Sequence, residues 1–359
     1  MSTPEHRYHI DRILEEKIQL FDNGMRYRQT VLNYLRHLRP TQGATFGLTD
    51  ARRYQLVERA ITELWVHSDK NPSIFKTSTD FEPVLQKNPY YRDHFIHSFN
   101  VFLMGYYIFN RLKQLYPQID LKTNDYNLTW MLASTFHDVA YPLQKMEEWL
   151  NDLFEGFFGV NPKFHYEITQ AMPLIYADYM RLIASCRQNQ LQGPLERRDA
   201  LELDWEFYNQ IGAKITEREH GVLGGLMLTH LLAVRQGFIK KDVWTFLYNH
   251  LPACYAITVH HLDVKLSFET HPIAFMLVLL DELQDWGRPS EKRKSGVRVM
   301  DIDVQQEGDV PSIRFVVKGS KGRLGEIAKA LSSRLEARTI SISIEKNDGS
   351  SVFSLNTRA

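Results

Sequence analysis

The sequence contains only two cysteines, Cys186 and Cys254, and neither belongs to a CxxC pair. Two thiols are too few for the disulfide framework of a small secreted scaffold. Long apolar runs are also missing, because the two longest are interrupted by His230 and Asp281 and are shorter than the ~20 residues that span a bilayer. The N-terminal residues show no apolar segment typical of a secretory signal. We therefore expect a cytoplasmic protein with no membrane partner.

Charge of one sign is not in excess, since 43 basic and 43 acidic side chains balance. A protein whose main partner is duplex nucleic acid or an anionic membrane would favour a basic surface, so we expect neither partner. The balance still permits a small phosphorylated substrate, which needs only local positive charge or a metal. Hydrophobic residues make up 43% of the chain and aromatic residues 12%, which is enough to bury a substantial core.

Apolar residues recur at helical spacing over most of the chain. This pattern predicts a helical extension at 1–80 and a mainly α-helical bundle at 81–290, where strand-like alternation is scarce. The polar segment 287–296 is typical of a linker. Beyond it, strand-like alternation, one helical segment and an Asn-Asp-Gly turn predict a small ββαββ module at 297–359. We expect this α+β module to regulate the protein or to form a homo-oligomer.

Histidine and acidic residues interrupt this helical pattern at five places beside apolar residues. These places are Arg92-Asp93-His94-Phe-Ile-His97, Phe136-His137-Asp138, Glu219-His220-Gly221, His260-His261 and Asp281. A lone carboxylate on a buried helix face is unfavourable unless it is paired or bound to a metal. Neutral imidazoles, together with carboxylates that offset the charge of a cation, are the ligands that a hydroxide-generating divalent site requires. The five places therefore predict a metal site.

The adjacent residues His137 and Asp138 add a geometric constraint. Neighbours on a regular helix point about 100° apart, so both side chains rarely reach one ion from the middle of a helix. A helix end or distortion at this doublet would let them converge, and an aspartate can bridge two metals with its two oxygens. Pro142, just beyond the doublet, is consistent with such a break.

One order of residues along the chain, H…HD…H…H…D, is carried by His97, His137, Asp138, His220, His260 and Asp281. The local sequences HSFNVFLMG, STFHDVAYP, EHGVLGGLML and LLDELQDWG surround them. This order resembles the HD-domain superfamily of metal-dependent phosphohydrolases over residues 90–288, more than half of the chain. The resemblance implies a helical metal-dependent hydrolase domain.

In that superfamily the first histidine, the doublet and the last aspartate bind one metal, and the two intermediate histidines bind a second, with the doublet aspartate bridging. The resemblance therefore implies a first site made of His97, His137, Asp138 and Asp281. It implies a second site made of His220 and His260, with His261 as an additional candidate. One or two divalent ions are expected as cofactors, drawn from Mn, Fe, Mg, Zn, Co and Ni.

Two departures bear on the subfamily. No Glu-Asp pair follows the doublet closely, which disfavours a ppGpp hydrolase of the stringent-response type. Leu-Asp-Val-Lys follows His260-His261 in place of the continuation HHxxxGYP, which disfavours a cyclic-di-GMP phosphodiesterase. The stretch between the doublet and His220 is long, and we expect residues 149–210 to form a helical insertion or lid.

Three side chains are candidates for catalysis: Asp138, His94 and His261. Asp138 would hold metal that lowers the pKa of a bound water to near neutrality. His94 or His261 would protonate the leaving oxygen. Asp93, one turn before His97, would orient this ligand or bind metal itself, or it is a surface carboxylate beside an arginine.

A polar stripe continues the last predicted helix beyond Asp281. Gln284 and Arg288 follow at helical spacing, which would place an amide and a guanidinium beside the metal. Arg288 could clamp a phosphate with two hydrogen bonds, and Lys145, two turns beyond the doublet, could do likewise. We expect these three residues to bind substrate, with the alternative that Arg288 only begins the charged linker.

The residues and the resemblance together predict a metal-dependent phosphohydrolase or phosphodiesterase that acts on a nucleotide or cyclic nucleotide through a metal-bound hydroxide. Two alternatives use the same residues. One is a mixed-valence di-iron HD-type oxygenase, which oxidises C–H bonds with the same order of six ligands. The other is a non-catalytic HD protein that senses a nucleotide in the pocket and signals through the C-terminal module.

Overall fold

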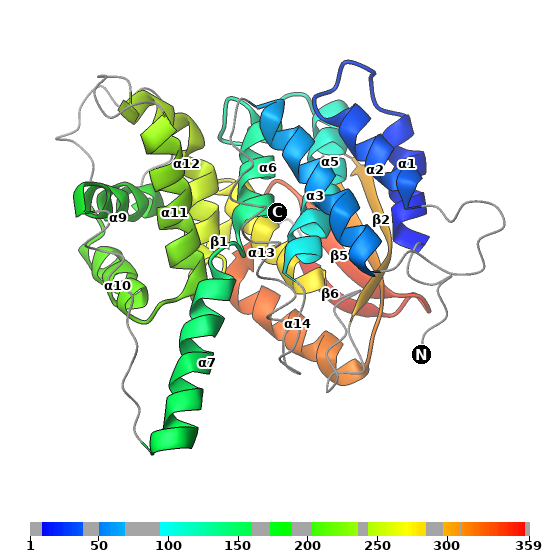
Figure 1. Ribbon diagram of the computed structural model, residues 1–359. Coiled ribbons are helices and arrows are strands. Elements are labelled where there is room, and N and C mark those ends of the chain that lie inside the picture. Colours follow the sequence, from blue (N-terminus) through cyan, green and yellow to red (C-terminus); the bar gives the residue numbers. More distant parts are fainter. Residues whose placement is uncertain are drawn as a thin grey trace.

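The computed structural model describes residues 9–38, 50–68, 94–159, 173–188, 203–235, 243–284, 297–308 and 310–355. Within them the protein is mainly helical, with a small mixed sheet near the C-terminal end (Figure 1). None of the described helices combines the length and the apolar character needed to cross a membrane. The prediction of a mainly α-helical protein with a small C-terminal α+β module is confirmed.

The helices are α1 (His9–Gln19), α2 (Arg28–His37), α3 (Asp50–Val66), α5 (Phe95–Leu115), α6 (Tyr126–Phe136), α7 (Tyr141–Phe158), α9 (Pro173–Gln188), α10 (Trp205–Thr216), α11 (His220–Arg235), α12 (Val243–Val259), α13 (Pro272–Leu283) and α14 (Lys321–Arg334). The strands are β1 (Leu266–Ser267), β2 (Arg298–Glu307), β3 (Val310–Lys318), β4 (Leu335–Glu336), β5 (Ser341–Lys346) and β6 (Ser351–Leu355). Helices α5, α6 and α13 lie in the middle, between α1–α3 with the sheet on one side and α9–α12 on the other (Figure 1).

Helix α5 is the central element of the fold. Nearly every residue from Phe95 to Leu112 is buried, and the helix packs against α3, α6, α13 and the sheet. Its approach to α6 is so close that a Cβ at Gly105 would collide with the Trp130 indole. Because the two helices lie together, residues at the start of α5 meet residues at the end of α6.

Helices α1–α3 cover α5 on one side (Figure 1). Tyr34 of α2 packs edge-on against Phe99, with ring centroids 4.6 Å apart. Lys17 of α1 donates a hydrogen bond to Asp301 of β2 at 3.0 Å. The described parts of 1–80 are therefore helical, as predicted, and they contact both the helical bundle and the C-terminal module.

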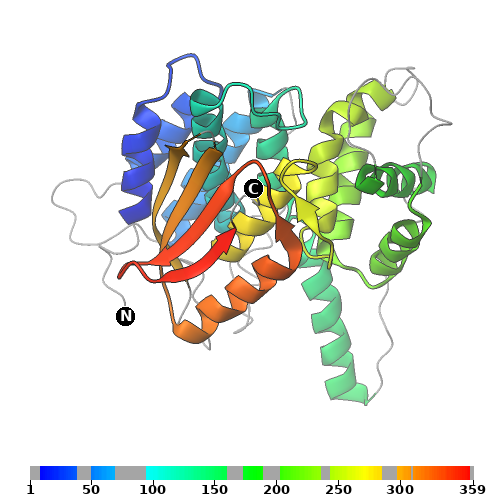
Figure 2. The ribbon, with the colours of Figure 1, turned by 180° about the vertical axis from the view of Figure 1, so that it is seen from behind.

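The four-stranded sheet and the helix of the C-terminal module follow the predicted ββαββ order, and the additional two-residue strand β4 pairs with β1 outside this sheet. Its strands pair in the order β2-β3-β5-β6, with a parallel pair β3-β5 between two antiparallel pairs. Helix α14 connects the two parallel strands and buries Leu324, Ile327 and Leu331. The last hairpin turns at the Asn-Asp-Gly sequence, where Gly349 has a φ of +81°. Seen from behind, the sheet lies over α5 and α1 (Figure 2).

Two predicted segments fall outside the described residues in whole or in part. The linker at 287–296 does so entirely. Within the insertion at 149–210, the described parts are helical and comprise the second half of α7, then α9 and the start of α10. Helix α7 extends away from the turn at the doublet, while α9 and α10 pack beside α11 and α12 (Figure 1). A role of this insertion as a lid stays a prediction.

Candidate metal centre

The doublet lies at the end of α6 and in the turn to α7. Helix α6 ends at Phe136, His137 is its C-cap residue, and residues 137–140 form a turn before α7 begins. Pro142 occupies the first turn of α7, where its missing N–H removes no helical hydrogen bond. The predicted helix end at the doublet is confirmed.

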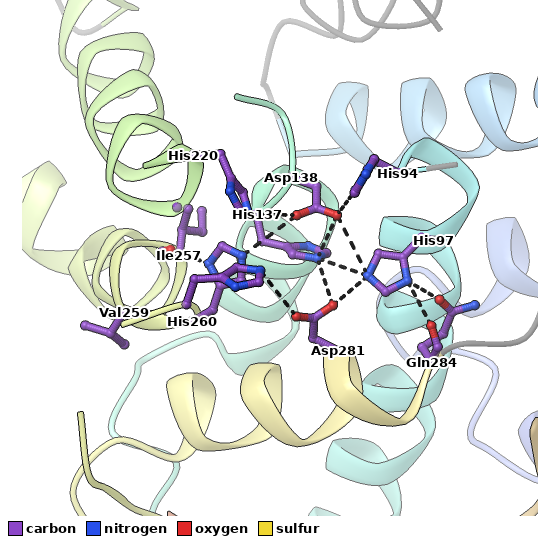
Figure 3. Close-up of polar contacts among 12 residues, drawn as sticks. His94, His97, His137, Asp138, His220, Ile257, Val259, His260, Asp281 and Gln284 are labelled. Atoms are coloured by element: carbon purple, nitrogen blue, oxygen red, sulfur yellow. Dashed lines mark hydrogen bonds and ion pairs between the residues drawn. The ribbon is translucent and has the colours of Figure 1, made fainter. Parts of the chain in front are cut away.

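Three ligand candidates on one side of the centre, here named the first ligand group, are His97 of α5, His137 and Asp281 of α13. His97 Nε2 lies 2.7 Å from Asp281 Oδ1 and 3.4 Å from His137 Nε2. His137 Nε2 lies 3.7 Å from the same Asp281 oxygen. The three side chains point toward one another (Figure 3), and together they could hold one metal ion.

The second ligand group comprises Asp138, His220, His260 and His261. His220 begins α11, and His260 follows the last residue of α12. Their Nε2 atoms lie 3.5 Å and 3.8 Å from Asp138 Oδ1. His260 is buried, whereas the His261 side chain is 48% exposed, with its Nε2 3.9 Å from Asp281 Oδ2. The structure thus brings both histidines to the site, His260 inside it and His261 at its edge.

Asp138, the carboxylate of the second group, also faces the first group and presents one oxygen to the histidines of each (Figure 3). Oδ1 faces His220 and His260 at the distances given above. Oδ2 lies 3.6 Å from His137 Nε2 and 3.9 Å from His97 Nε2. A carboxylate placed in this way can bridge two cations. The two groups are therefore halves of one centre.

Each of the four buried imidazoles has its Nδ1 atom held by an oxygen outside the centre. These hydrogen bonds join His137 to Ser134 O (2.8 Å), His260 to Ile257 O (2.6 Å), His220 to Gln144 Oε1 (2.9 Å) and His97 to Gln284 Oε1. Outer hydrogen bonds of this kind fix the tautomer and the ring direction of metal-binding histidines. With Nδ1 donating, Nε2 is the ligand atom of every ring, and Nε2 is the atom that faces the centre.

Two of these outer partners are glutamines. Gln284, predicted to bind substrate, is 1% exposed and lies behind His97. Substrate binding by this residue stays a prediction, and its position makes it an orienting partner of a ligand. Gln144 is a site residue that carries no sequence signal, because a glutamine on the amphipathic helix α7 has the same pattern whether it faces solvent or a histidine.

Two buried ligand atoms have no hydrogen-bond partner in the described part of the chain, namely His220 Nε2 and His260 Nε2. Leaving a buried polar atom unsatisfied costs about 1–3 kcal/mol. A divalent cation beside Asp138 Oδ1 would satisfy both atoms at once. Imidazole and carboxylate are also a donor set suited to first-row divalent metals. The residues present therefore fit a metal ion.

The charges of the centre favour ionised carboxylates. Burial would raise the pKa of Asp138, but His137 and His94 outweigh it and hold this pKa well below its usual value. Burial would likewise raise the pKa of Asp281, but hydrogen bonds from His137 and His97 hold this pKa well below its usual value. Burial lowers the pKa of His137, yet the two aspartates raise it overall. Both carboxylates are therefore anionic at neutral pH, as metal binding requires.

A glycine allows α11 to approach the end of α12. A Cβ at Gly221 would lie 2.8 Å from both His260 Nδ1 and Ile257 O, which is closer than such atoms pack. Glu219 starts the helix, since its carboxylate accepts hydrogen bonds of 3.0 and 2.8 Å from N–H groups of the first turn. The Glu-His-Gly sequence thereby places His220 at the first residue of α11, beside His260.

His94, a predicted catalytic residue, contacts the centre from the start of α5. Its Nδ1 lies 2.6 Å from Asp138 Oδ2, and its ring centroid lies 3.6 Å from that of Tyr141. The side chain is 11% exposed, so the ring lies at the inner wall of the site. This contact joins residues 44 positions apart and has no signature in the sequence.

The predicted phosphate-binding residues are described only in part. Lys145 pairs with Glu148 at 2.5 Å and lies over the Tyr141 ring, 5.3 Å from its centroid. The Tyr141 ring also packs against His94, so this ring separates the ammonium group from His94. Arg288 lies outside the described residues, as does Asp93. Their proposed roles stay predictions.

Comparison with protein-family models, with curated proteins and with solved structures finds no match to this chain. The geometry itself shows two His/Asp groups that could hold metal ions, joined by Asp138. The chemistry assigned to the centre rests on these residues.

Proposed function

We propose that this protein is an HD-type metal-dependent phosphohydrolase that acts on a nucleotide or cyclic nucleotide. The observation that carries the proposal is the pair of ligand groups joined by Asp138, with Nε2 of four buried histidines directed inward (Figure 3). The order of these residues along the chain also follows the HD pattern. One or two divalent ions would be held by His97, His137, Asp138, His220, His260, His261 and Asp281.

A divalent ion in such a centre supplies a Lewis acid that lowers the pKa of a water ligand and offsets charge on phosphoryl oxygens. The chain supplies the remaining functions. Asp138 and Asp281 provide the negative charge that attracts and holds the cations. The outer hydrogen bonds keep the imidazole rings in one orientation, so the ligands need no reorganisation when substrate binds.

His94 is our candidate for the group that gives a proton to the leaving oxygen. Its Nδ1 lies 2.6 Å from the Asp138 carboxylate, and its ring packs against Tyr141 with the two ring planes tilted by 31°, so the ring is held beside the centre. His261 is the second candidate, since its half-exposed side chain at the edge can reach a substrate. Lys145 would bind phosphate at the same rim, together with Arg288.

The experiment that tests this proposal is metal analysis of the purified protein combined with a screen of nucleotides and cyclic nucleotides. We expect bound first-row metal and release of phosphate or a nucleoside monophosphate, which a chelator abolishes and added metal restores. Hydrolysis that survives complete removal of metal would contradict the proposal.

The histidine-rich donor set also favours a second candidate, a mixed-valence di-iron HD-type oxygenase, because imidazole is a good ligand for iron. Iron content together with oxygen consumption would support it. Release of phosphate or a nucleoside monophosphate under anaerobic conditions would exclude it. A chain that binds metal and nucleotide but releases no product would instead be a non-catalytic sensor. The screen, extended by anaerobic assays, oxygen-consumption measurements and nucleotide-binding measurements, therefore separates the three functions.

A further inference from the structure

The helix that precedes His260 is capped from a distant part of the chain. Helix α12 ends at Val259, and the last carbonyl oxygens of a helix have no partner within it. Arg334, the last residue of α14, donates from Nη2 to Val259 O at 3.0 Å and to His260 O at 2.9 Å. A cation at a helix C-terminus also interacts favourably with the helix dipole. The C-terminal module thus holds the peptide that carries a ligand of the centre.

The position of this peptide determines where the His260 ring points. Its Nδ1 donates to Ile257 O at 2.6 Å, so the ring direction follows the turn between these residues. Its Nε2 then faces Asp138 Oδ1 at 3.8 Å, while Gly221 of α11 lies against the ring. A displaced 259–260 peptide would turn Nε2 away from Asp138 or press the ring against α11.

Arg334 also lies among acidic groups beside the centre. Burial lowers the pKa of Arg334, and attraction to Glu282, Asp281 and Asp263 opposes this effect. The guanidinium therefore contributes hydrogen bonds and charge at the same place. A methionine of similar length would keep much of the packing and lose both, which makes it an informative substitution.

A second set of contacts holds α14 over the end of α12. Strand β4 begins directly after Arg334 and pairs in parallel with β1 of the helical bundle. Glu269, just beyond β1, accepts hydrogen bonds from the N–H groups of Arg338 at 2.6 Å and Thr339 at 2.8 Å, and from the Thr339 hydroxyl at 2.9 Å. The module therefore docks on the segment that directly follows the ligand histidines.

We propose that Arg334 is a positioning residue of the metal centre, through which the C-terminal module sets the metal affinity of the second ligand group. The inference rests on the proposed function only in requiring that the centre binds metal. It gives the module a specific role, because the module then holds one ligand of the helical bundle in place from outside the bundle.

The test is a titration of the full chain with Mn²⁺ alone, in which calorimetry measures binding. Arg334→Met removes the donors and the charge, Arg334→Lys restores a charge and a donor, and Arg314→Met is the matched control. Arg314 lies on β3 and pairs with Glu345 at 2.9 Å. We expect Arg334→Met to weaken one of two Mn²⁺ equilibria by roughly 10- to 100-fold, the usual effect of removing an outer partner of a metal ligand. Arg334→Lys should lose less, and Arg314→Met should bind as the wild type does.

His220→Ala assigns the affected equilibrium, since it removes a ligand of the second group only. In that background Arg334→Met should cause no further loss at the remaining site. The visible absorption spectrum of bound Co²⁺ gives an independent readout, because it reports coordination geometry. Arg334→Met should change the spectrum of the weakened site and leave the other unchanged, which a general loss of stability would not do.

Two results would overturn this inference: Mn²⁺ affinities of Arg334→Met within about threefold of the wild type, or equal weakening of both sites. A wild-type chain that binds no metal would overturn the proposed function as well, so the two failures are distinguishable.

If Arg334→Met does not fold, Glu269→Gln is the second variant, because it loosens the same docking contact. It should weaken the same equilibrium by a smaller factor, and unchanged binding would count against the inference.

Discussion

The two ligand groups differ in how far the protein itself satisfies them. In the first group, His97 Nε2 lies 2.7 Å from Asp281 Oδ1, within hydrogen-bonding distance. In the second group, Nε2 of His220 and of His260 are buried and have no hydrogen-bond partner among the described residues. Without metal, a proton on His97 Nε2 can close the first group as a hydrogen-bonded network, and a cation would replace that proton. The second group has no such contact among the described residues, so a cation is needed to offset its burial. Metal should therefore stabilise the protein mainly through the second group.

The two groups also differ in the helices that hold their side chains in place. The first group is built on α5, α13 and the end of α6, which pack together in the middle of the bundle. The second group depends on Gln144 of α7, on the close approach at Gly221 of α11, and on Arg334 of α14. Because these supports come from separate elements, the second group should be the one that distant substitutions affect.

The largest expected effect comes from Asp138→Ala, which removes the carboxylate that both groups share. We expect hydrolysis to fall by at least about 10²–10³-fold, the scale for losing a group that stabilises transition-state charge, with loss of bound metal. Metal analysis, hydrolysis assays and circular dichroism check this, and the helical content should stay. Asp152→Asn, on the exposed face of α7, is the control and should behave as the wild type. Full activity of Asp138→Ala would refute the mechanism.

The next effect separates the two groups by thermal stability. Saturating Mn²⁺ at about 100 times Kd should stabilise the wild type by about 2.7 kcal/mol. His220→Ala should abolish most of the metal-induced rise in Tm, because it removes one of the two unsatisfied Nε2 atoms. His97→Ala should keep more of it. The readout for each variant is the Tm measured with metal minus the Tm measured with chelator. Equal values in His220→Ala and His97→Ala would show that metal stabilises the two groups to the same extent.

A smaller effect concerns the contact between α11 and α12. Gly221→Ala should destabilise the protein by about 1–3 kcal/mol, because the added methyl must displace His260 or the Ile257 carbonyl. Gly156→Ala is the matched control, since a Cβ there meets no atom within 4 Å on the exposed part of α7. That substitution should be neutral or stabilise by about 0.5–1 kcal/mol. Urea unfolding measures both, and similar values would mean that Gly221 is not tightly packed.

The features that the sequence predicts well are those set by neighbours along the chain. The helix end at the doublet follows from Pro142 and from the need of two adjacent side chains to converge, and the structure has it. The ββαββ order follows from local alternation and from the turn at Gly349. The contact between His97 and Asp281 is likewise in line with the sequence, because a polar residue on an otherwise apolar helix face needs a partner.

The features that the sequence does not predict are contacts between distant elements. The docking of Arg334 on the end of α12 joins residues 74 positions apart in the sequence, and no local pattern encodes it. Gln144 follows the ordinary pattern of an amphipathic helix, although its amide orients His220. Gln284 was expected beside the substrate from its spacing after Asp281. Its burial behind His97 follows from the end of α13 at Leu283, which takes the next residue off the helical path.

The smallest expected effect concerns the docking of the C-terminal module beside the second group. Burial would raise the pKa of Glu269, but hydrogen bonds from Ser267 and from the N–H groups of Arg338 and Thr339 lower it to about 2. Because this pKa is lower in the folded than in the unfolded chain, the ionised carboxylate stabilises the fold above pH ~4.5. This contribution is lost as the pH falls from about 4.5 to about 2.

Glu269→Gln should therefore lower the free energy of unfolding by about 1 kcal/mol at pH 7, a value reduced for the partial exposure of the side chain. The difference from the wild type should shrink as the pH approaches 3, where the wild-type carboxylate begins to lose its advantage. Urea unfolding in the presence of a chelator measures it without interference from metal binding. Glu336→Gln, on the exposed face of β4, is the control and should show no such pH dependence. A difference that stays constant from pH 7 to pH 3 would mean that the charge of Glu269 does not anchor the module, and that β1–β4 pairing and Arg334 hold it instead.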